Sequence, residues 1–490
     1  MCGTLGIIGG ISLGNAINAL QLLSHRGQDA SGLAWRNNET GEYIIKKARG
    51  LPKEIPIENP EYRPLFLIGS TRYPTFGSRG KNTTLEKFAQ PFESKKGVPV
   101  VISHNGNITN IPMLVDTQYE SDAEFIADYL GYLLKKHDKN LERAVLEFME
   151  TIDGSYAISG IFEKKLFTFR DPYGIRPLAF GYNDKLAVSS SESYVHEFLG
   201  INEWRDVKAG ELITVQISET LINGKNIFEI TSNQLVKKPK KAHCMFEWVY
   251  FANPCSKIEG LGVYQARLNL GRELAKQIIE KGAHYDYVVP VPDTSKVAAT
   301  SLAEKLGIPF REAIIKNRLL LRTFIIPDSD ERKNAAELKY HFVRDLIKDK
   351  KLLVVDDSIV RGLTSKKIIK KLKELGAKKV GIAVTCPPQK YPCYYGIDFP
   401  KETELIAHNK TIQQIKEELD ADELYYQKLD DLRIALENKE LCTACITGHY
   451  PTKHAEKIRL LITEKKIPVD SSHYEQASKQ LGDTQKIMLI

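Results

Sequence analysis

The pattern of apolar residues changes near residue 235, and this change constrains the fold more than any other feature of the chain. Before it, short apolar runs broken by glycine follow one another, as in Tyr156–Phe162 and Leu166–Phe169, and the clearest helical pattern is Asp122–Lys136. After it, apolar runs such as Tyr287–Val291 alternate with helical patterns such as Ser295–Leu306. Blocks of strands predict a layered α+β domain, whereas alternating strands and helices predict a doubly wound parallel sheet of the α/β class.

A chain of 490 residues is too long to fold around one core. We therefore expect a first domain over residues 2–235, a polar linker over 236–242, a second domain over 243–400 and a mostly helical C-terminal extension over 401–490. The strands expected in the second domain are Tyr287–Val291, Phe310–Ile315, Lys351–Val355 and Lys379–Thr385.

The composition is that of a soluble globular protein, with 42% hydrophobic and 27% charged residues. No apolar run reaches the roughly 18–20 residues of a membrane span, and the start lacks a secretory signal pattern. We therefore expect a cytoplasmic protein without a membrane partner. The net charge of +7 is modest, and the one basic run, Lys237–Lys241, fits a solvated linker better than a nucleic-acid site.

Two adjacent acidic residues, Asp356 and Asp357, directly follow the apolar run Lys351–Val355, and a turn with Gly362 leads into the next helical pattern. Ligands of open parallel sheets bind at the carboxyl ends of the strands. Two carboxylates there can hold sugar hydroxyls or a magnesium ion, and the N–H groups of the turn can hold a phosphate. An acidic helix cap is the simpler interpretation, but it leaves the Arg, Thr and Ser of this turn without a role.

Cys2 becomes the amino terminus if Met1 is removed, and it then carries a thiol and an α-amine together. An α-amine has a pKa of about 7.7–8.0, so it can accept the proton of its own thiol, as in enzymes with an N-terminal nucleophile. Taken alone, Cys2 is better explained as an accident of the start site. Four further segments change this interpretation: His25–Gly32, Thr71–Thr75, His104–Asn107 and Ser121–Glu124.

Together with Cys2, these segments resemble the class II glutamine amidotransferase family. The resemblance implies an αββα N-terminal-nucleophile hydrolase in which Cys2 attacks the side-chain amide of glutamine. Asn105 and the backbone N–H of Gly106 would stabilise the tetrahedral oxyanion, which needs positioned donors. The residues implied for binding glutamine are Arg26, Arg72, Thr75 and Asp122.

The second half resembles the type I phosphoribosyltransferase family, whose substrate is phosphoribosyl pyrophosphate (PRPP). The resemblance assigns Asp356 and Asp357 to the ribose hydroxyls and the turn from Ser358 to Ser365 to the 5′-phosphate, with Mg²⁺ at Thr294, Asp356 and Asp357. The full set of residues implied for PRPP is Thr294, Ser295, Lys316, Arg318, Lys339, Asp356, Asp357, Ser358, Arg361, Gly362, Thr364 and Ser365.

The combination of these two halves resembles the amidophosphoribosyltransferase family. The implied reaction, the first step of purine biosynthesis, converts PRPP, glutamine and water to 5-phosphoribosylamine, glutamate and pyrophosphate. Ammonia would pass between the two sites without reaching bulk water. The resemblance also implies a homodimer or homotetramer that purine nucleotides inhibit, with no nucleic-acid partner.

Only one pair of the seven cysteines, Cys442 and Cys445, has the spacing of metal ligands, and by itself it indicates half of a metal site or nothing. One branch of the resembled family holds a 4Fe-4S cluster, and its ligand positions match Cys244, Cys393, Cys442 and Cys445. Zinc would accept the same four thiolates. The resemblance gives no role to Cys255 or Cys386.

The phosphoribosyl half departs from the family pattern. Leu363 replaces a threonine in the PRPP loop, and Leu321 and Ser329 alter a segment expected to close over PRPP. Two alternatives follow: a paralogue with an active glutaminase but a weakened or changed synthase, and a PRPP-sensing regulator. The joint presence of Cys2, Arg72, Asn105 and Asp122 argues against the regulator, which would have no use for a glutaminase site.

Overall fold

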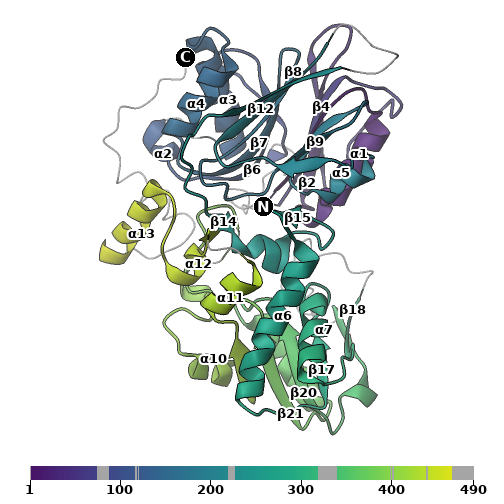
Figure 1. Ribbon diagram of the computed structural model, residues 1–490, viewed down its shortest axis with the longest axis vertical. Coiled ribbons are helices and arrows are strands. Elements are labelled where there is room, and N and C mark those ends of the chain that lie inside the picture. Colours follow the sequence, from purple (N-terminus) through teal and green to yellow (C-terminus); the bar gives the residue numbers. More distant parts are fainter. Residues whose placement is uncertain are drawn as a thin grey trace.

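The structure is a computed structural model of two lobes joined end to end (Figure 1). It describes residues 2–73, 88–115, 119, 121–218, 227–317, 339–397, 399, 402–437 and 440–465. Four residues named above, Thr75, Arg318, Leu321 and Ser329, lie outside these ranges. Within the described part of the chain, no helix is long and apolar enough to cross a membrane.

Two antiparallel sheets lie face to face in the first lobe (Figure 1). The first has the strand order β11 (Trp204–Asp206), β9 (Ala179–Tyr182), β10 (Ala187–Ser190), β1 (Cys2–Ile8), β4 (Phe66–Arg72), β2 (Ala30–Arg36), β3 (Tyr43–Arg49). The second has the order β13 (Phe228–Gln234), β12 (Glu211–Ile217), β8 (Lys165–Arg170), β7 (Gly154–Phe162), β6 (Val101–Ile108), β5 (Phe92–Glu93).

Helices cover the outer face of each sheet. The apolar core between the sheets includes Ile68, Val101 and Ile161, and separate cores join the helices to the sheets. The result is the expected αββα sandwich. The elements over the first sheet are α1 (Leu13–Leu22), η1 (Leu23–His25), η2 (Pro52–Glu54) and α5 (Tyr194–Phe198), and those over the second are α2 (Ile111–Leu114), α3 (Asp122–Lys136) and α4 (Leu141–Thr151).

The second lobe contains the expected doubly wound parallel sheet. Its strand order is β17 (Tyr287–Pro290), β20 (Lys351–Asp356), β21 (Lys379–Val384), β22 (Glu423–Tyr426). On one face lie α6 (Val263–Glu280) and α7 (Lys296–Leu306), and on the other lie α9 (Leu363–Glu374) and α10 (Ile412–Leu419).

Two details of this sheet differ from the expectation. The run Phe310–Ile315 does not form a full strand of the sheet: Phe310 makes a single bridge to Val288, and β18 (Ile314–Lys316) pairs instead with β19 (Tyr340–Phe342) as a separate ribbon. The sheet also continues past residue 400, because β22 pairs with β21. Parallel strands need long crossovers, so a strand this far along the chain can still join the sheet.

The C-terminal part of the chain lies beside the junction of the lobes (Figure 1). Side chains of the first lobe bind its neighbouring loop: Asn107 Nδ2 donates to the carbonyl of Tyr394 at 2.9 Å, and Ser155 Oγ donates to that of Tyr395 at 2.9 Å. The remaining elements are β14 (His243–Cys244), the π-helical turn η4 (Glu247–Phe251), β15 (Lys257–Ile258), β16 (Leu261–Gly262), η6 (Arg344–Leu346), η7 (Glu402–Glu404), α11 (Leu429–Ala435), β23 (Leu441–Cys442), α12 (Ala444–Thr447) and α13 (Lys453–Lys465).

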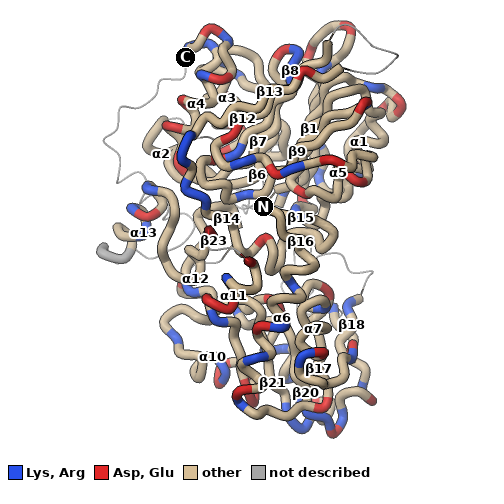
Figure 2. Tube along the Cα trace, in the orientation of Figure 1, with Lys and Arg blue, Asp and Glu red and all other residues tan. Residues whose placement is uncertain are grey.

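Charged residues of both signs are interspersed over both lobes (Figure 2). The basic run of the linker is exposed at Lys237, Lys238, Lys240 and Lys241, which agrees with its interpretation as a solvated connection.

Candidate active sites

The predicted nucleophile begins the central strand of the first sheet. Cys2 is the first residue of β1 and is 9% exposed. Its register partner on β4 is Arg72, and side chains that lie opposite in an antiparallel pair point to the same face. The sheet therefore places the cation predicted for the carboxylate of glutamine beside the thiol.

Asn105, on β6 of the other sheet, faces the amino end of β1. The backbone N–H of Cys2 donates to Asn105 Oδ1 at 3.3 Å, and Asn105 Nδ2 is buried and has no hydrogen-bond partner among the residues that the structure describes. Buried polar atoms are almost always paired, so this one calls for an explanation. An unpaired donor next to the nucleophile is what a developing oxyanion requires.

Gly106, the next residue, has φ +151°, and a Cβ there would lie 2.0 Å from the carbonyl oxygen of Ser155. Only glycine fits this close approach of β6 to β7. The close packing of β6 on β7 thus fixes the position of the Gly106 N–H, which is the predicted second oxyanion donor.

Asp122 lies in the first turn of α3, where the Ser121 side chain caps the helix by accepting from the N–H of Ala123 at 3.2 Å. The cap fixes the start of the helix and points Asp122 toward β6, because Asp122 Oδ2 lies 3.6 Å from His104 Nδ1. Burial lowers the pKa of His104, although Asp122 opposes this shift. The predicted anion for the amine of glutamine therefore lies beside the strand that carries Asn105.

Arg26 lies beneath the nucleophile and is 1% exposed. Its Nε donates to the carbonyl of Cys2 at 3.2 Å, and its terminal nitrogens donate to Glu192 and Glu247. These contacts occupy the guanidinium. The assignment of Arg26 to glutamine binding stays a prediction, and the contacts indicate support of the nucleophile's backbone.

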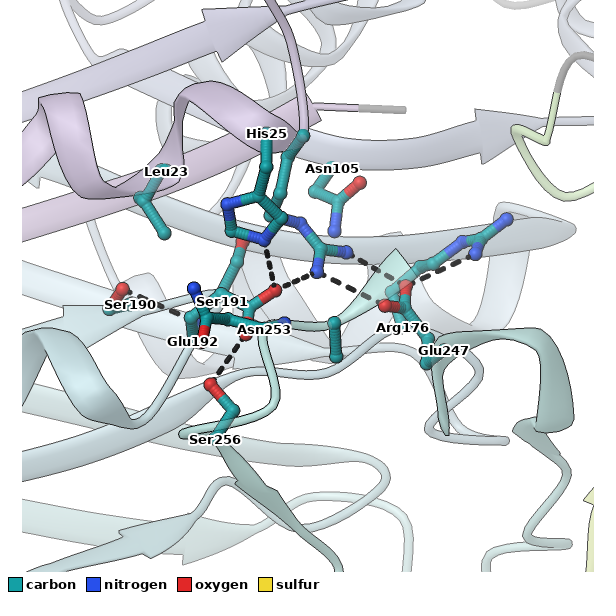
Figure 3. A network of polar contacts seen from close by, with 12 residues as sticks. Leu23, His25, Asn105, Arg176, Ser190, Ser191, Glu192, Glu247, Asn253 and Ser256 are labelled. Carbon is teal, nitrogen blue, oxygen red and sulfur yellow. Dashed lines mark hydrogen bonds and ion pairs between the residues drawn. The ribbon is translucent and has the colours of Figure 1, made fainter. Parts of the chain in front are cut away.

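Figure 3 shows the buried network that this arginine enters. Glu192 also accepts from His25 at 3.0 Å and from Ser256 Oγ at 2.5 Å, and Arg176 Nη1 lies 3.4 Å from Glu247. Burial alone would raise the pKa of Glu192, but Arg26 and His25 outweigh it and hold this pKa at about 2. No local pattern in the sequence shows that Arg176, Glu192 and Glu247 meet.

The acidic pair predicted for PRPP lies at the carboxyl end of β20. Asp356 and Asp357 are 9% and 8% exposed, and Ser358 Oγ donates to Asp357 Oδ1 at 2.7 Å. Burial and their mutual repulsion raise the pKa of Asp356, and burial raises that of Asp357 to about 6. Such a buried acidic pair is suited to a cation or to hydroxyl donors.

The turn that follows leads into α9. Gly362 has φ +76°, and a Cβ there would lie 2.4 Å from Ile406 Cδ1, so the turn requires glycine. Leu363, which begins α9, is 64% exposed, so its side chain points away from the core. Arg361 Nε donates to Glu404 at 2.8 Å, which ties one predicted phosphate ligand to a surface acid.

A second loop lies at the same edge of the sheet, because β17 and β20 are parallel neighbours that end together, with Pro290 opposite Val355. It carries Thr294 and Ser295, and Ser295 Oγ donates to the carbonyl of Val291 at 2.5 Å. The remaining predicted PRPP residues lie on adjoining described segments: Lys316, bonded to Asp293 at 3.2 Å, Lys339 beside β19, and Thr364 and Ser365 in the first turn of α9.

Arg267 of α6, which sequence reasoning missed, joins this site to the junction. It is 3% exposed and donates to the carbonyls of Trp248 and Ala252, at 3.0 and 2.8 Å, at the two ends of η4. Burial lowers its pKa, and Asp357 opposes that shift. An arginine in an apolar helical pattern gives no sequence signal of such a role.

The four predicted cluster cysteines lie in one buried core beside the junction. Cys244 and Cys442 are register partners in the β14–β23 pair, and Cys393 and Cys445 pack in the same core. Burial raises the pKa of Cys244 to about 11. Among the described residues, no three His, Cys, Asp or Glu side chains converge on a position for one metal ion. Cys386, which had no predicted role, also lies in this core, whereas Cys255 is exposed.

Both lobes match known domain families. The phosphoribosyl transferase domain family matches residues 261–412, and the glutamine amidotransferase domain family matches residues 78–197. An N-terminal-nucleophile glutamine amidotransferase fused to a phosphoribosyltransferase is therefore the class of enzyme that fold and site define.

Full-length relatives narrow this class. The amidophosphoribosyltransferase of Pyrococcus horikoshii is 37% identical over 92% of this chain and 96% of its own length, and that of Escherichia coli is 35% identical over 93% and 94%. A solved glutamine PRPP amidotransferase from B. subtilis, in complex with ADP and GMP, superposes with a TM-score of 0.80 at 31% identity over 92% of this chain and 98% of that one. The chain belongs to the amidophosphoribosyltransferase family. The expected enzyme class and its place at the first step of purine biosynthesis are confirmed.

Proposed function

We propose that this chain releases ammonia from glutamine at Cys2 and transfers it to C1 of PRPP at the Asp356–Asp357 loop. The observation that carries the proposal is the Nδ2 of Asn105, which lies beside the amino end of Cys2, is buried and makes no hydrogen bond within the described part of the chain. A structural asparagine would have that donor paired.

In the first reaction, Cys2 Sγ attacks the side-chain carbonyl carbon of glutamine. The oxyanion that forms accepts hydrogen bonds from Asn105 Nδ2 and the N–H of Gly106, while Arg72 and Asp122 hold the carboxylate and amine of glutamine. Once Met1 has been removed, the α-amine of Cys2 takes the thiol proton and passes it to the leaving nitrogen, so the C–N bond breaks to give ammonia and a thioester. Water then hydrolyses the thioester to glutamate and restores the thiol.

In the second reaction, ammonia attacks C1 of PRPP and the bond from C1 to pyrophosphate breaks. Asp356 and Asp357 bind the ribose hydroxyls, and the turn into α9 binds the 5′-phosphate at the start of a helix. Thr294, Asp356 and Asp357 would hold Mg²⁺, which neutralises charge on the pyrophosphate group when bound. Mg²⁺ is usually bound by only one or two protein carboxylates, with substrate phosphates as further ligands. The two carboxylates at the end of β20 match this number.

The four cysteines in the junction core would hold a 4Fe-4S cluster, for which an all-thiolate donor set is suited. Zinc would accept the same four thiolates. Iron and sulfide analysis of anaerobically purified protein, with its visible absorption spectrum, decides between them. Stoichiometric zinc without sulfide would overturn the cluster.

Two further properties belong to the same proposal. The B. subtilis structure contains ADP and GMP, which supports purine nucleotides as feedback inhibitors of this chain. We also expect a homodimer or homotetramer, which light scattering coupled to gel filtration would measure.

The experiment that tests the function measures pyrophosphate release from PRPP and Mg²⁺, comparing the unmodified chain with Cys2→Ala. With glutamine as the nitrogen source, release should be lost in the variant and should return when ammonia is supplied. Glutamate formation without pyrophosphate release would instead support the paralogue with a weakened synthase. Release that is unaffected by the substitution would overturn the assignment of Cys2.

A further inference from the structure

A buried glutamine, Gln90, lies beside the nucleophile and has no place in the mechanism above. Its side chain is 2% exposed. Its Oε1 accepts from the backbone N–H of His104 at 2.6 Å, and its Nε2 donates to the carbonyl of His104 at 3.0 Å. Because a backbone N–H can only donate, the first contact fixes which end of the amide is oxygen.

In this orientation one N–H of the Gln90 amide donates to the carbonyl of His104, and the other N–H can donate to the thiol of Cys2. A primary amide nitrogen carries two protons, and Gln90 Nε2 lies 3.8 Å from Cys2 Sγ, within the range of a hydrogen bond to sulfur. A thiol accepts such a bond weakly, whereas an ionised acceptor makes bonds roughly twice as strong as a neutral one. The contact therefore favours the thiolate, which is the nucleophilic form.

Among the described residues, the other polar side chains around Cys2 do not supply this contact. Arg26 bonds the carbonyl of Cys2, Asn105 accepts from its backbone N–H, and Arg72 donates to the carbonyl of Phe88. The charged or titratable side chains of the described residues around Cys2 are His25, Arg26, Arg72 and His104, with the carboxylates Glu192, Glu247 and Asp122 that lie against them. Once Met1 is removed, the α-amine of Cys2 joins them.

We propose that Gln90 is a further catalytic residue of the glutaminase site, which donates a hydrogen bond to Cys2 Sγ and stabilises the thiolate. The same amide makes two hydrogen bonds to the backbone of His104, the residue before Asn105. It therefore also fixes the position of the oxyanion donor, Asn105, relative to the nucleophile, Cys2. This inference rests on the proposed role of Cys2.

The chain offers a matched control for loss of a buried amide. Asn110 is 8% exposed and makes the same double contact with backbone in the same lobe: Nδ2 donates to the carbonyl of Thr151 at 2.9 Å, and Oδ1 accepts from the N–H of Asp153 at 3.0 Å. In the described part of the chain, its side-chain hydrogen bonds go to Thr151 and Asp153 and not to Cys2. Asn110→Asp replaces the donor of an equivalent buried amide, as Gln90→Glu does, but at a position that does not contact the thiol.

The test is the rate of alkylation of Cys2 by iodoacetamide across pH, located by peptide mass spectrometry, in the unmodified chain, Gln90→Glu, Gln90→Met and Asn110→Asp. Gln90→Glu keeps the shape but replaces the donor with an acceptor. We expect its pH midpoint to rise and its rate at pH 7 to fall about tenfold, with about a threefold fall in Gln90→Met. Asn110→Asp should keep the midpoint of the unmodified chain.

Unchanged midpoints in both Gln90 variants, with folding verified by circular dichroism, would overturn the proposal. An equal shift of the pH midpoint in Asn110→Asp would also overturn it, because the loss of any buried amide in this lobe would then have the same effect on Cys2. Failure of the proposed function gives a different result: glutamine hydrolysis would survive Cys2→Ala whatever the alkylation profile shows.

Discussion

Arg26 of the glutamine amidotransferase lobe donates to Glu247 of the phosphoribosyltransferase side at 2.8 Å, with both side chains almost completely buried. The same guanidinium donates to the carbonyl of the nucleophile, Cys2. Glu247, which follows the linker in the sequence, is thus connected to the backbone of Cys2 through the side chain of Arg26 alone. Glu247 also faces Arg176, which donates to the carbonyl of Tyr395 at 2.8 Å in the loop after Cys393.

Replacing Glu247 with Gln should destabilise the protein strongly. The change leaves Arg26 and Arg176 with one buried carboxylate fewer, and breaking a buried ion pair costs about 3–5 kcal/mol. Urea denaturation followed by tryptophan fluorescence should show a loss of about 3 kcal/mol in the free energy of unfolding. Glu163→Gln, which removes an exposed partner of Lys139, is the control and should cost about 0.5 kcal/mol or less. Equal losses in the two variants would contradict this account.

Asn105→Asp should separate the two reactions. The new carboxylate can still accept from the N–H of Cys2, but it cannot donate to an oxyanion. Loss of one oxyanion donor lowers kcat by about 100- to 1000-fold, so glutamine-dependent synthesis should fall by that factor. Synthesis from added ammonia should remain close to that of the unmodified chain. A parallel fall in both activities would show that Asn105 acts on the fold rather than on the oxyanion.

Glu192 should make stability depend on acidic pH. Its pKa in the folded chain, about 2, lies below the ordinary value of 4.5, so the folded state favours the carboxylate. This contribution is present above about pH 4.5 and is lost as pH falls toward 2, with a total of about 3 kcal/mol. The difference in unfolding free energy between the unmodified chain and Glu192→Gln should therefore shrink between pH 5 and pH 3. A difference that stays constant over this interval would refute the depressed pKa.

Leu363→Thr should improve the PRPP site without changing stability. Leu363 is 64% exposed at the start of α9, so replacing it removes little buried surface and should change the unfolding free energy by about 0.5 kcal/mol or less. A hydroxyl at this position can donate to the 5′-phosphate, and one hydrogen bond of about 1 kcal/mol lowers KM for PRPP about fivefold. The comparison of KM for PRPP with KM for glutamine checks this, since only the former should move.

Much of the fold and part of each site could be predicted from local pattern. The acidic pair at the end of β20 was expected because an apolar run and the two acids after it are adjacent in sequence. Phe310–Ile315 shows the limit: its residues suit a strand, yet β18 pairs with β19 outside the sheet. Pairing depends on which neighbour the folded lobe presents, and a single segment does not encode that choice.

By itself, the sequence determined the two fold classes, because strand period and helical pattern are local properties, and through resemblance to known families it predicted the nucleophile with its Asn-Gly partner and the PRPP loop. Only the tertiary structure decided that Gln90 faces Cys2 across 88 positions of sequence and that Glu247 reaches Arg26 across 221. Those contacts arise where one sheet stacks on the other and where the lobes dock. The sequence next to a buried glutamine or glutamate does not identify its hydrogen-bond partner. The role of such a residue therefore follows from its burial and from the groups that tertiary packing brings within hydrogen-bond distance.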